Sequence, residues 1–125
     1  MRFDQIVAFV VTTKPEEAKA FYRDKLGFAF IQDDSFALVF DAHGTMLRIV
    51  KMKKFTPAAY TILGWEVDAI DKAVAELSSC GVAFERYEGM AQDHLGIWNA
   101  PGGSKVAWFK DPDGNVLSLS QHAPV

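Results

Sequence analysis

The chain contains 125 residues with a net charge of −3; half of the residues are hydrophobic and 23% are charged. This composition excludes an intrinsically disordered chain, and ten Phe, three Tyr and three Trp residues supply enough buried surface for one compact domain without disulfides. The negative charge argues against a nucleic acid as partner, and the longest apolar run, residues 6–11, is too short to cross a membrane.

The N-terminal residues and the cysteine count indicate a cytoplasmic protein. Residues 1–4 lack the long apolar segment of a signal peptide, and Cys80 is the single cysteine, so no internal disulfide forms. We therefore expect a reducing compartment. Cys80 falls in the last turn of a predicted helix without a neighbouring His or basic side chain, which favours a small buried hydrophobic residue over a nucleophile.

The first half of the chain predicts a strand, a helix and three further strands. Pro15, followed by Glu16 and Glu17, indicates a helix start, and Gly27 falls where a left-handed residue would end the helix. Residues 41–44 predict a hairpin turn. The elements expected cover residues 6–13, 15–25, 28–32, 36–40 and 45–52.

The second half predicts the same order of elements. Ile70, Val74 and Leu77 mark the apolar face of a helix that ends at Gly81. Residues 111–114, Asp-Pro-Asp-Gly, predict a turn between two strands, because proline presets φ and glycine accepts a positive φ. The strands expected here cover residues 60–67, 82–87, 105–110 and 115–121.

An internal repeat relates the two halves. A shift of 54 residues superposes Gly27 on Gly81, and it also superposes Phe9 on Leu63 in the first strand of each half. Each half is a βαβββ module that is too small to bury its own sheet face. The prediction is a single α+β domain over residues 1–125, in which two tandem βαβββ modules, about 1–55 and 58–122, form paired half-barrel sheets around a cleft.

Two segments resemble a known family. Residues 16–28, EEAKAFYRDKLGF, and residues 108–117, WFKDPDGNVL, are similar to the first helix and the C-terminal turn of the vicinal oxygen chelate superfamily. That superfamily includes glyoxalase I, bleomycin-resistance and fosfomycin-resistance proteins, and extradiol dioxygenases. The resemblance covers essentially the whole chain and implies the paired βαβββ fold, but it does not identify the reaction, because one fold hosts many chemistries.

The resemblance also implies where a metal ion would bind. Enzymes of this superfamily hold a divalent metal with His and Glu side chains on the first and last strands of each module. The four positions fall here at Ala8 (Val7 or Gln5 under other alignments), Arg48, Ile62 and Ser118. None of these side chains is a usual donor for a transition metal, and the positive charge of Arg48 repels a cation. We therefore expect neither a metal nor another cofactor.

Strand periodicity indicates which side chains face the cleft, because successive residues alternate between the two faces of a sheet. Leu47, Leu63 and Leu117 are expected to pack under the helices, which leaves the alternate positions for the cleft. Those positions are Met46, Arg48, Val50, Ile62, Gly64, Glu66, Val116, Ser118 and Ser120. The cleft is then mostly apolar with few polar groups, which is typical of a small-molecule site.

Arg48 allows two interpretations. A guanidinium among apolar neighbours needs a partner, so Arg48 either forms an ion pair with Glu66 or reaches solvent at the strand edge. Alternatively, it binds the carboxylate or phosphate of a ligand.

The aromatic side chains and the histidines also have two interpretations each. Trp98, Trp108, Tyr60 and Phe36 offer stacking surface for a ligand, although such rings more often pack in a core or a dimer interface. His94 lies in a predicted loop, either as a surface residue or as part of a lid over the pocket.

Three classes of function remain open. The first is a metal-free protein that holds a small molecule in its apolar cleft, with Arg48 as an anion anchor. The second is a metal-dependent lyase, isomerase or dioxygenase with a nonstandard ligand set, although the missing ligands disfavour glyoxalase-type activity. The third is a regulatory or interaction module that retains the fold alone. A homodimer is expected because open half-barrels leave strand edges and apolar surface uncovered. Candidate ligand-binding residues are Ala8, Met46, Arg48, Val50, Ile62, Glu66, His94, Trp98 and Ser118.

Overall fold

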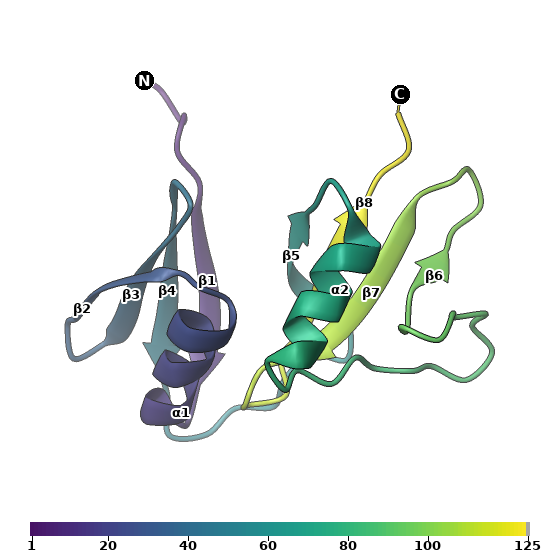
Figure 1. The fold of residues 1–125 in the computed structure, drawn as a ribbon. Coiled ribbons are helices and arrows are strands. Elements are labelled where there is room, and N and C mark those ends of the chain that lie inside the picture. The colour runs from purple at the N-terminus through teal and green to yellow at the C-terminus, as the bar shows by residue number, and fades with distance from the viewer. Residues whose placement is uncertain (125) are drawn as a thin grey trace. The chain divides into compact units, whose positions relative to one another are not determined.

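The repeat of strands and helices that the sequence predicts is present in the computed structural model, which describes residues 1–124 (Figure 1). The chain divides into two units. The first unit comprises Met1–Pro57 together with Asp111–Asn115, and the second comprises Ala58–Lys110 and, among the described residues, 116–124. The predicted α+β fold with two tandem modules is confirmed. None of the helices formed by residues 1–124 has the length and apolar character needed to cross a bilayer.

The first unit contains one helical segment and a four-stranded sheet. Its elements are β1 (Val7–Thr12), α1 (Pro15–Ala20), η1 (Phe21–Lys25), β2 (Ala29–Asp33), β3 (Ala37–Ala42) and β4 (Thr45–Lys51). The strand order is β1-β4-β3-β2; β1 runs parallel to β4, and the other neighbours are antiparallel. Side chains from the helical segment and from one face of the sheet together form a buried core.

Helix α1 begins at Pro15 with Glu16 and Glu17 in its first turn, as predicted. It continues into η1, a π-helical turn, and Gly27 follows with a φ of 76°. A π turn contains more residues than an α turn. The helical segment of the first unit therefore takes twelve steps from Pro15 to Gly27, whereas the second unit takes eleven from Ile70 to Gly81.

The second unit repeats this arrangement. Its elements are β5 (Thr61–Glu66), α2 (Ile70–Ser79), β6 (Trp98–Asn99), β7 (Lys105–Lys110) and β8 (Val116–Gln121). The strand order is β5-β8-β7-β6, with β5 parallel to β8. Helix α2 packs on β7 and β8, where Ile70, Val74 and Phe109 are almost completely buried.

One predicted strand is wrong. Residues 82–87 form only an isolated bridge, between Phe84 and Phe109 on β7, and the fourth strand of the sheet is the short β6. The side chain of Gln92 explains the difference: its Oε1 accepts from the Tyr87 amide at 2.7 Å and its Nε2 donates to the Glu85 carbonyl at 2.9 Å. Backbone groups that a strand pair would use are thus occupied. Cys80, expected to be buried, is exposed.

The Asp-Pro-Asp-Gly turn lies between β7 and β8 but belongs to the first unit. Asp111 accepts a hydrogen bond from the buried Tyr22 hydroxyl at 2.8 Å, and Asn115 Nδ2 donates to the Val11 carbonyl at 2.9 Å. Asp113 accepts from the Thr12 hydroxyl, and from the amide and hydroxyl of Thr13 at 2.7 Å each. Partial burial raises the pKa of Asp113, but these hydrogen bonds outweigh it and hold that pKa below its ordinary value.

Candidate functional site

The sheet of the first unit buries one face and leaves the other open. On β1 and β4, Val10 lies in register with Ile49, and both are at most 1% exposed. The alternate register pairs occupy the opposite face. We call these six residues the first open face: Val7, Phe9, Val11, Met46, Arg48 and Val50. Met46, Arg48 and Val50 therefore lie on one face, as strand periodicity indicates.

Ala8 does not share this face. It lies in register with Leu47, which is 1% exposed and packs toward the helix. Ala8 falls at the expected position when the two halves are related by a shift of 54 residues. The π turn adds one residue to the first helical segment, so the residues before that segment are related to the second half by a shift of 55 residues. The superposition of Phe9 on Leu63 is wrong for the same reason: Phe9 is 59% exposed on the open face.

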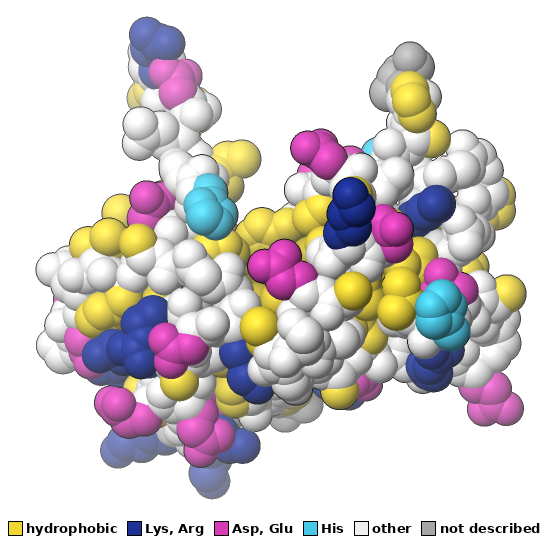
Figure 2. All heavy atoms as spheres, viewed as in Figure 1, with side chains coloured by type: hydrophobic (Ala, Val, Ile, Leu, Met, Phe, Trp, Pro, Cys, Tyr) yellow, Lys and Arg dark blue, Asp and Glu magenta, His cyan; other side chains and the backbone are white. Residues whose placement is uncertain are grey.

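A pocket of about 480 Å³ opens beside the N-terminal end of β1. Its lining residues are Asp4, Gln5, Ile6, Val7, Ile31, Val39, Phe40, Asp41, Gly44, Thr45 and Met46. Ile6, Ile31 and Met46 are all exposed, so this unit presents a group of uncovered apolar side chains. Figure 2 shows apolar side chains at the surface of this unit beside intermixed basic and acidic ones. The volume lies within the usual range for small-molecule sites, about 300–1,000 Å³.

Arg48 forms an ion pair with Asp34 in the first unit. Arg48 Nη2 donates to Asp34 Oδ2 at 2.8 Å, and both side chains are 27% exposed. This hydrogen bond, together with those from the backbone amides of Ala37 and Phe36, lowers the pKa of the Asp34 carboxyl. The ion-pair partner of Arg48 is thus a residue of its own unit. Glu66, in the second unit, accepts hydrogen bonds from the ring and, at 2.9 Å, from the backbone amide of His122.

The sheet of the second unit also has an open face. Ser118 on β8 lies in register with Gly64 on β5 and with Trp108 on β7. The neighbouring positions Leu117 and Leu119 are buried on the α2 side. We call the following six residues the second open face: Gly64, Glu66, Val106, Trp108, Ser118 and Ser120.

Ile62, Trp98 and His94 have different positions relative to this face. Ile62 is the extra residue at an irregularity of β5 and has no register partner. Trp98 on β6 pairs with Val106, and its ring centroid lies 6.1 Å from that of Trp108. His94 is exposed in the loop before β6. The structure thus places Glu66, Ser118 and Trp98 on or beside the second open face, whereas His94 belongs to a loop and to no strand of the sheet.

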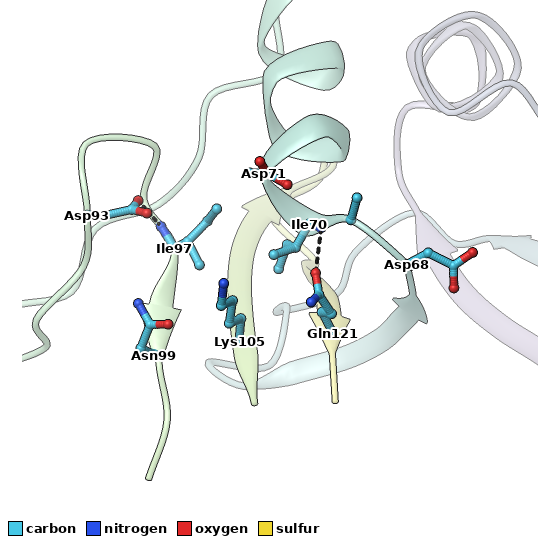
Figure 3. A pocket seen from close by; sticks show the side chains of 9 residues that line it. Asp68, Ile70, Asp71, Asp93, Ile97, Asn99, Lys105 and Gln121 are labelled. Atoms are coloured by element: carbon cyan, nitrogen blue, oxygen red, sulfur yellow. Dashed lines mark hydrogen bonds between the residues drawn. The ribbon is translucent and has the colours of Figure 1, made fainter. Parts of the chain in front are cut away.

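A second pocket, of about 240 Å³, lies at the start of α2 (Figure 3). In Figure 3, Gln121 reaches from β8 to the backbone amide of Ile70, to which its Oε1 is bonded at 2.9 Å. Asp93 accepts from the Ile97 amide at 2.9 Å, while Lys105 lies beside Gln121 on the neighbouring strand. Two polar side chains of this pocket, Gln121 and Asp93, therefore accept hydrogen bonds from backbone amides. Nothing in the sequence pattern predicted this pocket.

The residues present do not fit the divalent metal that the resemblance implies. Among residues 1–124, no three His, Cys, Asp or Glu side chains gather as a metal would require. On the open faces, Arg48 supplies a positive charge and Ser118 a neutral hydroxyl, and Gly64 supplies no side-chain donor. Zinc, iron and manganese need imidazole, carboxylate or thiolate ligands.

Two further features of the site were not predicted from the sequence. Asp34 was not expected to hold Arg48, although its position after Asp33 at a strand end is typical of a turn in which a carboxylate caps backbone amides. The lining of the larger pocket by Asp4 and Asp41 had no sequence signal, because these residues are far apart along the chain.

Comparison with known proteins finds matches over nearly the whole chain. The family model of the Glyoxalase/Bleomycin resistance protein/Dioxygenase superfamily matches residues 2–119. No curated protein sequence matches significantly. The solved structure of TnmS3, an antibiotic binding protein from Streptomyces sp. CB03234, is 29% identical with a TM-score of 0.72, and the match covers 98% of this chain and 99% of that chain.

Two further solved structures share the fold at lower identity. A member of the Glyoxalase/bleomycin resistance protein/dioxygenase superfamily from Sphaerobacter thermophilus DSM 20745 is 23% identical with a TM-score of 0.75, covering 97% of this chain and 98% of that chain. The fosfomycin resistance protein FosX from Listeria monocytogenes is 14% identical with a TM-score of 0.74, covering 98% of this chain and 96% of that chain. Since the family model spans nearly the whole sequence, the chain belongs to the Glyoxalase/Bleomycin resistance protein/Dioxygenase superfamily.

Proposed function

We propose that this protein binds an apolar small molecule carrying an anionic group on its first open face, without a metal ion, and that Arg48 is the anchor for that group. The observation that carries the proposal is the position of Arg48. Its guanidinium lies on the face that also presents Phe9 and Met46, and Asp34 holds it there. A guanidinium has five N–H donors, so it can bind a carboxylate or phosphate while one donor remains on Asp34.

The relatives support binding rather than a particular reaction. TnmS3 is described as an antibiotic binding protein and FosX as a fosfomycin resistance protein. The donor set on the open faces argues against the metal chemistry of the enzymes in the same superfamily. The proposed role is therefore sequestration of a small molecule.

A matched pair of probes tests the anchor. Wild-type protein is expected to bind naphthalene-2-carboxylate more tightly than 2-naphthalenemethanol by calorimetry, because only the first carries an anion for Arg48. Arg48→Gln should weaken carboxylate binding about tenfold, the usual effect of losing one charge-assisted hydrogen bond. Arg23→Gln is the control, since Arg23 is an exposed arginine paired with Asp24 in the same unit. Equal weakening in both variants, or no difference between the probes, would contradict the proposal.

The metal-free state and the homodimer are tested on protein purified without a metal-affinity tag. We propose a homodimer because Phe9 and Ile31 are both more than half exposed on an otherwise structured unit. Sedimentation at micromolar concentration is expected to give the mass of two chains. Elemental analysis of the same protein is expected to find no stoichiometric Zn, Fe, Ni or Mn. A monomer overturns the homodimer, and a stoichiometric metal overturns the metal-free assignment.

A further inference from the structure

The second open face contains a hydroxyl without a partner. Ser118 is only 6% exposed, yet its side chain makes no hydrogen bond with the residues that the structure describes. No side-chain nitrogen or oxygen within residues 1–124 is both sealed from solvent and unpaired. The Ser118 hydroxyl therefore keeps a small opening toward the outside. A buried hydroxyl normally finds a partner within the protein, so this one is available to a ligand.

Gly64 leaves the space in which this hydroxyl lies. A Cβ atom at position 64 would be 2.5 Å from Ser118 Oγ, which is closer than two such atoms approach. Any side chain at this position would displace the hydroxyl. Gly64 is itself exposed, so the hydroxyl lies over bare backbone on the accessible side of the sheet.

Aromatic rings flank the hydroxyl on its other side. Trp108 lies in register with Ser118, and the rings of Trp98 and Tyr87 approach it with centroids 6.1 Å and 5.4 Å away. All three rings are partly exposed. Trp65 lies in register with Leu119 on the opposite face and stacks on Phe109.

The two residues in register with Ser118, Gly64 and Trp108, are uncharged. Trp108, Trp98 and Tyr87 present aromatic surface, and the hydroxyl of Ser118 is a hydrogen-bond donor between them and Gly64. Aromatic surface favours a flat, conjugated ligand, which stacks with offset or tilted geometry. A donor next to that surface favours a ligand with an acceptor at the edge of its ring.

We propose that the second open face binds an uncharged planar conjugated ring that carries a carbonyl group. The ring packs against Trp98 and Trp108, and the carbonyl oxygen accepts a hydrogen bond from the Ser118 hydroxyl. This inference rests on the proposed function, because it adds a second subsite for a small molecule. It involves different residues from the Arg48 anchor and a different, neutral part of the ligand.

Coumarin, a neutral planar lactone, and naphthalene, which lacks the carbonyl, are the probes. In nitrogen-15 NMR spectra of the full chain, coumarin is expected to shift the indole signals of Trp98 and Trp108 and to leave that of Trp65 unchanged. Ser118→Ala should weaken coumarin binding about threefold to tenfold, the usual effect of one neutral hydrogen bond, and leave naphthalene binding unchanged. Ser78→Ala, which removes an exposed hydroxyl on α2, is the control.

Gly64→Ala provides a second variant in which Ser118 is retained but its hydroxyl is displaced, so it should weaken coumarin binding as well. Trp98→Leu should weaken both probes. The inference is overturned if coumarin shifts all three indole signals alike or none of them, or if both Ser118→Ala and Gly64→Ala bind coumarin as the wild type does. If naphthalene-2-carboxylate still binds through Arg48 in that case, the proposed function stands and only the second subsite fails.

Discussion

Replacing Asp111 by alanine is expected to lower the free energy of unfolding by about 4 kcal/mol, because it leaves several buried donors without an acceptor. The carboxylate of Asp111 accepts from the Tyr22 hydroxyl and Asn115 Nδ2 at 2.8 Å, and from the amides of Asp113 and Asn115 at 3.0 Å. Burial raises the pKa of Asp111, and these hydrogen bonds oppose that rise. Burial and the nearby negative charge also raise the pKa of Tyr22.

Two further variants separate the effect of losing the hydrogen-bond acceptor from the effect of losing side-chain volume or a surface charge. Asp111→Asn keeps the size but turns one acceptor into a donor that faces other donors, so it should still cost about 2 kcal/mol. Asp24→Ala removes an exposed carboxylate paired with Arg23 and should leave the free energy of unfolding nearly unchanged. Urea unfolding followed by circular dichroism measures all three. A cost for Asp111→Ala no larger than that for Asp24→Ala would show that the turn does not hold the first unit together.

Phe40→Ala is expected to destabilise the protein by about 3–5 kcal/mol, the range for deleting a buried aromatic ring. Phe40 is fully buried, and its ring lies 5.4 Å from that of Phe30 and 6.1 Å from that of Tyr22. It also lines the larger pocket. Urea unfolding followed by circular dichroism measures this loss of stability.

Phe36→Ala is the matched control for this variant. The two phenylalanines are close in sequence, but Phe36 is 78% exposed and its removal should change the free energy of unfolding by less than about 0.5 kcal/mol. Similar costs for the two variants would indicate that Phe40 is not part of a tightly packed core.

Local patterns predicted most of the fold. Pro15 and the two glutamates after it marked the start of the first helix, and Gly27 and Gly81 marked the helix ends with the positive φ expected of them. Strand β7 has the predicted bounds, and the alternation along β4 places Arg48 on the face opposite the buried Leu47 and Ile49. These features depend on neighbours in the sequence, so a single sequence contains enough information to predict them.

Features that depend on distant residues were not predictable in this way. The π turn adds one residue inside a helix without changing its amphipathic pattern, and this put Phe9 out of phase with its counterpart. The strand expected at residues 82–87 has a suitable pattern, but Gln92 takes its backbone partners. Similarly, Arg48 and Asp34 meet because a bulged hairpin places them together. Each outcome follows from tertiary structure rather than from propensity.

The location of residues 111–115 has a consequence for recombination of the two repeats. This turn is encoded within the second repeat, but the first unit uses it to bind the Tyr22 hydroxyl and the Val11 carbonyl. A gene fragment encoding only residues 1–57 therefore lacks the acceptor for Tyr22. Exchange of one repeat with that of a homologue between Pro57 and Ala58 likewise combines the turn with foreign partners for its side chains. A functional chimera must therefore take Thr12, Tyr22 and the turn from the same parent protein.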